Sequence, residues 1–107
     1  MNLHDIEERI LILCPFVKEI VVTIENGHPF ATIYPNFQTL KSAHIINIES
    51  EIRWYGIELY NMVVEESQKV RGYFISTHPL PKTASGEFDT SRVKELLNKT
   101  KQTMQTA

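Results

Sequence analysis

The sequence predicts a small α+β domain in which a three-stranded sheet, including one antiparallel hairpin, is covered by about three helices. Apolar residues recur at helical spacing in three segments, and β-branched residues concentrate in three short runs. An Asn-Gly pair separates the first two runs. With 107 residues, 42% of them hydrophobic, the chain has room for one core, so residues 1–107 are expected to form a single domain.

The first predicted helix lies at the amino terminus and ends before Pro15. Its apolar positions recur every three or four residues, at Leu3, Ile6, Ile10 and Leu13. Cys14, the only cysteine, follows within the apolar run ILILCPF. We therefore expect Cys14 to be buried and structural rather than a nucleophile.

Three strands are predicted, at about residues 17–24, 30–34 and 70–76. Asn26 and Gly27 favour the positive φ angles of a tight turn, which makes the first two strands an antiparallel hairpin. Pro79 and Pro81 end the third strand, because proline cannot donate to a sheet ladder. The stretch from Pro35 to Lys41 is expected to be a loop.

A long helix is predicted from Asn47, a suitable N-cap, to about Val63. Its expected buried stripe consists of Ile48, Ile52, Tyr55, Leu59, Met62 and Val63. Gly56 costs about 1 kcal/mol relative to alanine in a helix, so it indicates close packing or a weak point. Core packing is the expected role of the aromatic residues Trp54, Tyr55 and Tyr60.

The last helix is expected to begin near Asp89 or Thr90 and to bury Val93, Leu96 and Leu97. The tail after about Asn98 loses the apolar period and is expected to be disordered.

Composition disfavours several functions. The formal net charge of −2 gives no basic face for nucleic acid, and no apolar run approaches the ~18 residues of a membrane span. The first ten residues are acidic and amphipathic, unlike a secretion signal, so a cytoplasmic location is expected. The four histidines are scattered, and no metal site is expected.

The loop from Leu80 to Glu87 is the strongest candidate site. Gly86 allows backbone shapes that other residues resist, and the following helix N-terminus suits an anion. Lys82 adds a positive charge, and Thr83 and Ser85 add hydroxyl groups. An ordinary capped loop remains an alternative at this point.

The segment PLPKTASGEFDTSRVKELL resembles the pattern PKTxSGKIxRxxLRxLL near the end of AMP-forming acyl-CoA synthetases, members of the adenylate-forming superfamily. Upstream, DIEERILILCPFVKEIVVTIENGHPFATIYP resembles that family's EIExxLxxHPxVxEaaVv segment and the strand pair after it. The resemblance covers nearly the whole chain. It implies the small C-terminal lid domain, which rotates over a large domain that binds ATP and the acyl group.

The resemblance also implies ligands and site residues. ATP with Mg²⁺ and coenzyme A serve the family, and this chain alone is expected to bind neither. Thr83, Ser85 and Gly86 match the loop that meets the nucleotide.

The sequence departs from the family where the chemistry is concentrated. Glu87 stands at the position of the catalytic lysine. A unit charge pair at 4 Å is worth about 4 kcal/mol at an effective dielectric of 20, so its reversal predicts a loss of adenylation by several orders of magnitude. Lys82, five residues earlier, is a secondary candidate for that role, and Thr90 stands near a usually basic position. The family's hinge pattern GRxDxxIKxxG has no counterpart before Asn2.

Three hypotheses follow. The favoured one is a lid-domain homologue that is inactive alone and docks on a separate large adenylating domain, or is a fragment of a longer enzyme. The second is a binding or assembly module that recognises a carrier protein or forms a homodimer through a sheet edge or the long helix. An active stand-alone ligase is disfavoured, because so small a domain has no ATP pocket of the family's kind.

Overall fold

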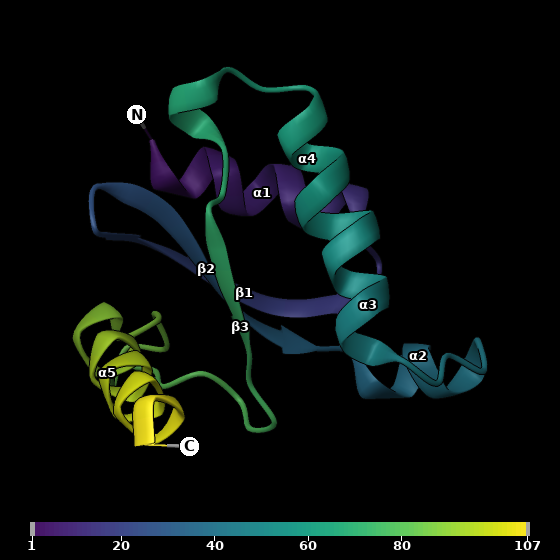
Figure 1. Cartoon of the computed structure of the whole chain (residues 1–107). Coiled ribbons are helices and arrows are strands. Elements are labelled where there is room, and N and C mark those ends of the chain that lie inside the picture. Colours follow the sequence, from purple (N-terminus) through teal and green to yellow (C-terminus); the bar gives the residue numbers. More distant parts are fainter. Residues whose placement is uncertain (1, 107) are drawn as a thin grey trace.

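The structure is a computed structural model that describes the backbone of residues 2–106 and the side chains of residues 2–99. The fold has a three-stranded sheet, which lies between helices on its two faces (Figure 1). The elements in chain order are α1 (Leu3–Leu13), β1 (Val17–Glu25), β2 (His28–Pro35), α2 (Phe37–Ser42), α3 (Ile48–Ile52), α4 (Leu59–Met62), β3 (Gly72–Ile75) and α5 (Thr90–Thr106). The predicted α+β class is therefore confirmed.

The sheet has the order β1-β2-β3, with β1 antiparallel to β2 and β2 parallel to β3. The predicted hairpin is present, and Asn26 and Gly27 at its turn have φ angles of 54° and 80°. Two adjacent positive φ angles match the right-handed twist of the strands they join. The sheet is therefore mixed. Because β2 is the central strand, β1 and β3 are the two edges.

Helices cover both faces of the sheet, but unequally. On one face, alternate strand residues such as Ile20, Val22 and Ile33 join the main core with α1 and the long helix. On the other face, Val21 packs with Leu80 and Val93, beneath α5. In Figure 1, α1 and α4 lie on the upper right of the sheet and α5 lies on the lower left.

Cys14 lies in the main core with no exposed surface. Burial in an apolar environment disfavours the thiolate and raises the pKa of the Cys14 thiol, while hydrogen bonds from backbone groups of Phe16 and Val17 oppose that effect. The expectation that Cys14 is structural is confirmed.

The predicted long helix exists, and Ile52 is buried and Ile48 partly buried as predicted, but the rest of the expected buried stripe is wrong. Between α3 and α4 the chain makes a π-helical turn, Arg53–Glu58, and the backbone N–H of Leu59 donates to the carbonyl of Trp54, five residues earlier. The wider turn shifts the side chains that follow around the helix. The buried residues are Ile52, Gly56, Ile57 and Tyr60.

The displaced stripe faces solvent. Tyr55 and Leu59 are 52% and 39% exposed, and Met62 and Val63 are 79% and 75% exposed. The expectation of core packing is right for Tyr60 and wrong for Tyr55 and for Trp54, which is 56% exposed. Gly56 does mark close packing, because it lies against Ile10 and Cys14.

Two further differences concern the loops and the end of the chain. The predicted loop after Pro35 contains the short helix α2, whose N-cap Asn36 accepts a hydrogen bond from the backbone N–H of Thr39. The final helix begins at Thr90, as predicted. Disorder after about Asn98 stays a prediction, since it concerns mainly residues outside those with described side chains. Among the described helices, none has the length and apolar character to cross a membrane.

Candidate functional site

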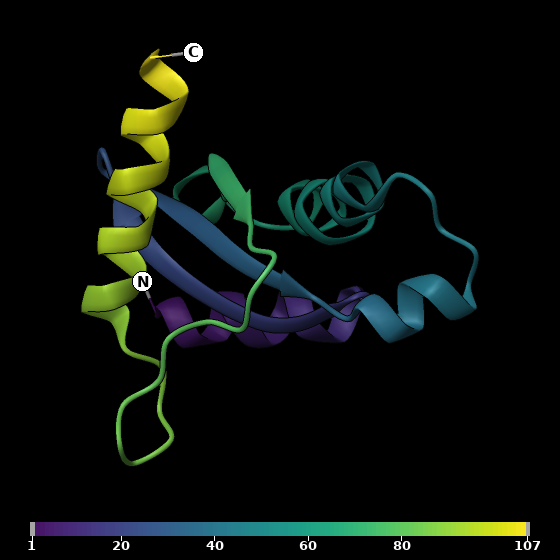
Figure 2. The ribbon, with the colours of Figure 1, turned by 90° about the horizontal axis from the view of Figure 1, so that it is seen from below.

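The loop between β3 and α5 folds into a small hairpin. Lys82 and Phe88 pair across it in an antiparallel bridge. The backbone N–H of Thr83 donates to the carbonyl of Glu87 at 2.7 Å, and that of Gly86 donates to the carbonyl of Thr83 at 3.0 Å. Gly86 has a φ of +89°, which confirms that it adopts a conformation other residues resist. Figure 2 shows this loop projecting from the body of the domain.

Lys82 holds the loop against the sheet. Its Nζ lies 2.9 Å from Oε2 of Glu19 on β1, and 5.4 Å from the centre of the Phe88 ring. Glu19 Oε1 also accepts the backbone N–H of Leu80 at 2.9 Å. Lys82 is therefore paired with the shielded Glu19 carboxylate, although its own side chain remains 46% exposed.

The contacts with Lys82 and Leu80 change the pKa of Glu19. Burial disfavours its carboxylate and would raise the pKa, but the hydrogen bond from Lys82, the Leu80 N–H and the charges of Lys82 and Lys18 together outweigh burial. The net effect lowers the pKa of Glu19 below its ordinary value, so the carboxylate remains charged at neutral pH.

The hydroxyl groups of the loop bond to each other. Thr83 Oγ1 and Ser85 Oγ are 2.9 Å apart and both residues are exposed. They lie on the hairpin turn beside Gly86. The loop thus keeps the three residues that match the family motif close together at its tip.

The N-terminus of α5 is capped by the chain's own carboxylate. Asp89 Oδ1 accepts the backbone N–H of Arg92 at 3.2 Å, and Asp89 Oδ2 lies 3.5 Å from Nε of the same arginine. A carboxylate at this position satisfies a free helix N–H and complements the helix dipole. It also places a negative charge where the sequence suggested an anion would bind.

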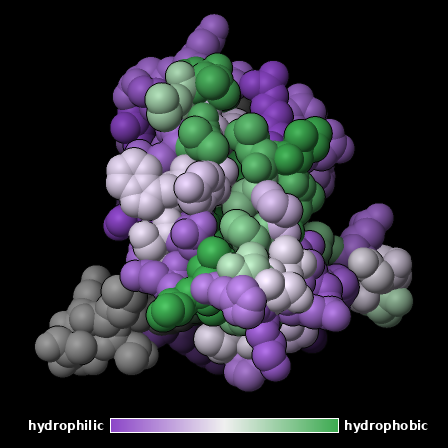
Figure 3. All heavy atoms as spheres, turned by 90° about the vertical axis from the view of Figure 1, so that its right-hand side faces the viewer, coloured by the Kyte–Doolittle hydropathy of each residue, from purple (hydrophilic) through white to green (hydrophobic). Residues whose placement is uncertain are grey.

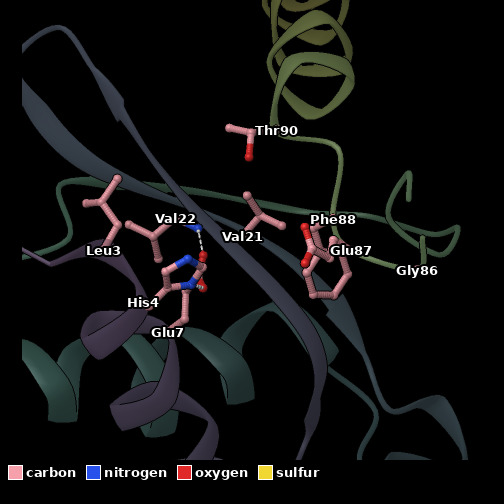
Figure 4. A pocket seen from close by; sticks show the side chains of 9 residues that line it. All are labelled: Leu3, His4, Glu7, Val21, Val22, Gly86, Glu87, Phe88 and Thr90. Atoms are coloured by element: carbon pink, nitrogen blue, oxygen red, sulfur yellow. Dashed lines mark hydrogen bonds and ion pairs between the residues drawn. The ribbon is translucent and has the colours of Figure 1, made fainter. Parts of the chain in front are cut away.

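The loop forms one wall of an open pocket of about 640 Å³. Figure 4 shows Glu87 and Phe88 on one side and His4 and Glu7 of α1 on the other, with β1 between them. Glu7 Oε2 accepts the backbone N–H of Val22, at the free edge of β1, at 2.7 Å. The residues that line the pocket are Leu3, His4, Glu7, Val21, Val22, Gly86, Glu87, Phe88 and Thr90.

The contribution of α1 was not anticipated from the sequence. Glu7 lies between apolar positions of an amphipathic helix and looks like a solvated charge, yet its side chain is only 15% exposed. Its Oε1 is 3.0 Å from Nδ1 of His4. The available signal was indirect, because an edge strand needs some group to cover its free N–H groups.

The pocket is acidic. Glu7 and Glu87 line it, and none of its lining residues is a lysine or arginine. The nearest cations of the loop and of α5, Lys82 and Arg92, are paired with Glu19 and Asp89. As built, the pocket lining offers no lysine or arginine to meet the negative charge that develops during acyl or phosphoryl transfer.

Metal binding has no visible site in the described part of the chain. No group of three or more His, Cys, Asp and Glu side chains there lies close enough to hold a metal ion. His4 is paired with Glu7 at the pocket rim.

A comparison with solved structures supports the fold, whereas no known sequence family and no curated protein sequence matches the chain. The structure is similar to part of the adenylation domain of a carboxylate reductase from Mycobacterium chelonae, with a TM-score of 0.74 and 12% sequence identity. The likeness covers 100% of this chain and 18% of that one. It establishes a shared α+β fold with part of an adenylation domain.

Proposed function

We propose that this chain is a homologue of the C-terminal lid domain of AMP-forming acyl-CoA ligases, and that it is inactive alone. In that family, an acid and ATP give an acyl-adenylate and pyrophosphate, after which a thiol forms the thioester. The lid supplies a loop to the first step, and a separate or longer chain would supply the large ATP- and acyl-binding domain.

The coincidence of fold and motif carries this proposal. The whole chain matches part of an adenylation domain in fold, and the segment that resembles the family's lysine loop forms a projecting hairpin beside a pocket. Fold and motif are independent, because the fold likeness holds at 12% identity. Neither would carry the proposal alone.

The chemistry of the loop supports inactivity. Gly86 still sets the backbone, and Glu87 is exposed at the pocket wall. In the family, a lysine there would stabilise charge on the reacting carboxylate and phosphate, whereas Glu87 repels both. Lys82 is a poor substitute, because leaving Glu19 would abandon a part-buried carboxylate.

Glu87→Lys tests the proposal. The variant should fold normally, because the Glu87 side chain is exposed and its backbone bond to Thr83 is kept. It would be mixed with the large domain of a two-domain ligase whose own lid has been deleted, and ATP–pyrophosphate exchange would be measured. We expect the natural chain to add nothing and Glu87→Lys to raise exchange about 100-fold or more.

Controls separate loop chemistry from docking. Glu95→Lys makes the same charge change on α5, away from the pocket lining, and should leave exchange at background. Calorimetric titration would measure binding to the large domain in parallel. A Glu87→Lys variant that binds but gains no exchange would contradict the role given to Glu87, and exchange by the natural chain alone would contradict the proposal of inactivity.

A further inference from the structure

The displaced stripe of the long helix joins apolar residues of α1 to form one solvent-facing surface. We call it the exposed apolar face, and it consists of Ile12, Leu13, Tyr55, Leu59, Met62 and Val63. Tyr55, Leu59 and Met62 are three or four residues apart and share one side of the helix. Figure 3 shows apolar side chains gathered on the side of the molecule where the long helix lies.

The two elements meet at a shallow hollow of about 260 Å³. Ile12 and Leu13 line it from α1, and Tyr60 and Val63 line it from the long helix, with Arg9 as its one charged residue. Met62, next to Val63 in the chain, is 79% exposed, and Ile12 on the wall of the hollow is 82% exposed. The face thus carries an apolar hollow and apolar projections side by side.

The face is as large as the largest apolar patches that monomers expose. At about 150 Å² for each fully exposed side chain, the lower end of the range for aromatic residues, the exposed fractions of these six residues give roughly 550 Å². That is the upper end of the largest apolar patch on a typical monomer, about 300–600 Å². Two such faces together approach the lower limit of a stable protein–protein interface, about 1,200 Å².

We propose that the exposed apolar face binds a second copy of this chain and forms a dimer with two-fold symmetry. A two-fold contact requires a surface that complements itself, which an adjacent hollow and projection provide. The projection at Met62 of each copy enters the hollow of the other, where Ile12 contributes to the wall.

The pairing buries few charges, because Arg9 is the only charged residue of the hollow. The π turn supports the assignment, because such turns within helices are frequent at functional sites. Here it turns apolar residues outward, which lowers solubility unless they are covered. The dimer face is separate from the loop pocket and does not depend on the proposed adenylation role.

The direct test is sedimentation equilibrium of the full chain over a concentration series, compared with Met62→Glu. We expect the natural chain to reach the mass of two chains, and Met62→Glu to weaken association at least about tenfold. Ile46→Glu is the matched control, because Ile46 is 96% exposed and lies outside the face, between α2 and α3. A single-chain mass at every concentration up to about 1 mM would overturn the proposal.

Spin labels locate the interface independently of the mass. Met62→Cys and Ile46→Cys offer exposed thiols, whereas the native Cys14 has no exposed surface and is not labelled. Pulsed electron resonance should give a short label-to-label distance within the dimer at position 62 and a longer one at position 46. A dimer that persists in Met62→Glu, or a shorter distance at position 46, would place the contact elsewhere and overturn the assignment.

Discussion

At the scale of single residues, Glu19 connects the candidate loop to the sheet. One of its oxygens accepts from Lys82 and the other from the backbone N–H of Leu80, so one carboxylate fixes both the start of the loop and its cation. Its side chain is 12% exposed, and a charge so shielded interacts more strongly than one at the surface. The position of the loop should therefore depend on the ionisation of Glu19.

Glu19→Gln should lower the free energy of unfolding by about 1 kcal/mol at neutral pH, because the amide keeps a hydrogen bond but loses the attraction to Lys82. The pKa of Glu19 is lowered by folding, so its contribution is present above the ordinary value of 4.5 and is lost as pH falls through the folded-state pKa. Urea unfolding at a series of pH values would show the difference between the two proteins disappearing in acid.

The control for this pH effect is Glu65→Gln, which makes the same substitution at an exposed position. It should change stability little at any pH. A Glu19→Gln deficit that stays constant as the pH falls below 4.5 would show that lost packing, rather than charge, is responsible.

The residues of the site were predictable only as far as the signals were local. The positive φ of Gly86 and the start of α5 at Thr90 follow from neighbouring residues, and the sequence predicted both. The partners of Lys82 and Val22 are Glu19 and Glu7, which lie far along the chain from them. No local pattern specifies such pairs, because the tertiary fold brings them together.

At the scale of elements, the long helix was predicted correctly as a helix, but the side of it that is buried was not. Its length and its apolar composition were predicted, but the expected stripe assumed 3.6 residues per turn throughout. The π turn at Arg53–Glu58 breaks that period, so Ile57 and Tyr60 are buried in place of Leu59 and Met62. Both sets are apolar, and sequence alone could not choose between them.

The prediction of the other elements depended in the same way on how local their signals are. The short helix α2 has a local signal in its N-cap Asn36, but six residues carry too little apolar periodicity to predict a helix. The parallel pairing of β3 with β2 was not specified, because a strand of four residues carries no signal for its direction. The hairpin was predictable, because Asn26 and Gly27 are residue types that favour the positive φ angles of its turn.

Two glycines in these elements should respond oppositely to alanine. At Gly56, a Cβ would lie 3.6–3.8 Å from atoms of Cys14 and Ile10, in ordinary contact, so Gly56→Ala should raise the free energy of unfolding by about 0.5–1 kcal/mol. At Gly72, a Cβ would lie 2.8 Å from the Phe30 ring, so Gly72→Ala should lower it by about 1–3 kcal/mol. Thermal unfolding of the two variants beside the natural chain gives the comparison.

Each glycine variant serves as the control for the other, because the chemical change is identical. A loss of stability in Gly56→Ala would mean that the π turn itself requires glycine rather than tolerating it.

At the scale of the whole molecule, the two faces of the sheet are held very differently. The main core joins α1, the long helix and both hairpin strands through many buried residues. The opposite layer rests on Val21, Leu80 and Val93, with Tyr34 beside them. A layer with so few buried contacts should open without the rest of the domain.

The final prediction therefore concerns the order in which the domain opens. In native-state hydrogen exchange, the amides of α5 up to Lys99 should exchange through local opening, with a lower free energy than the amides of β1 and β2. Val93→Ala, which removes two methyl groups from a fully buried side chain, should lower α5 protection by about 2 kcal/mol and leave the central strands almost unchanged. Ile10→Ala, in the main core, should instead lower protection of the strands and α1 together by about 2–5 kcal/mol. Equal losses throughout the domain in both variants would show that α5 and the sheet unfold as one cooperative unit, because the smaller layer would then be as firmly coupled as the core.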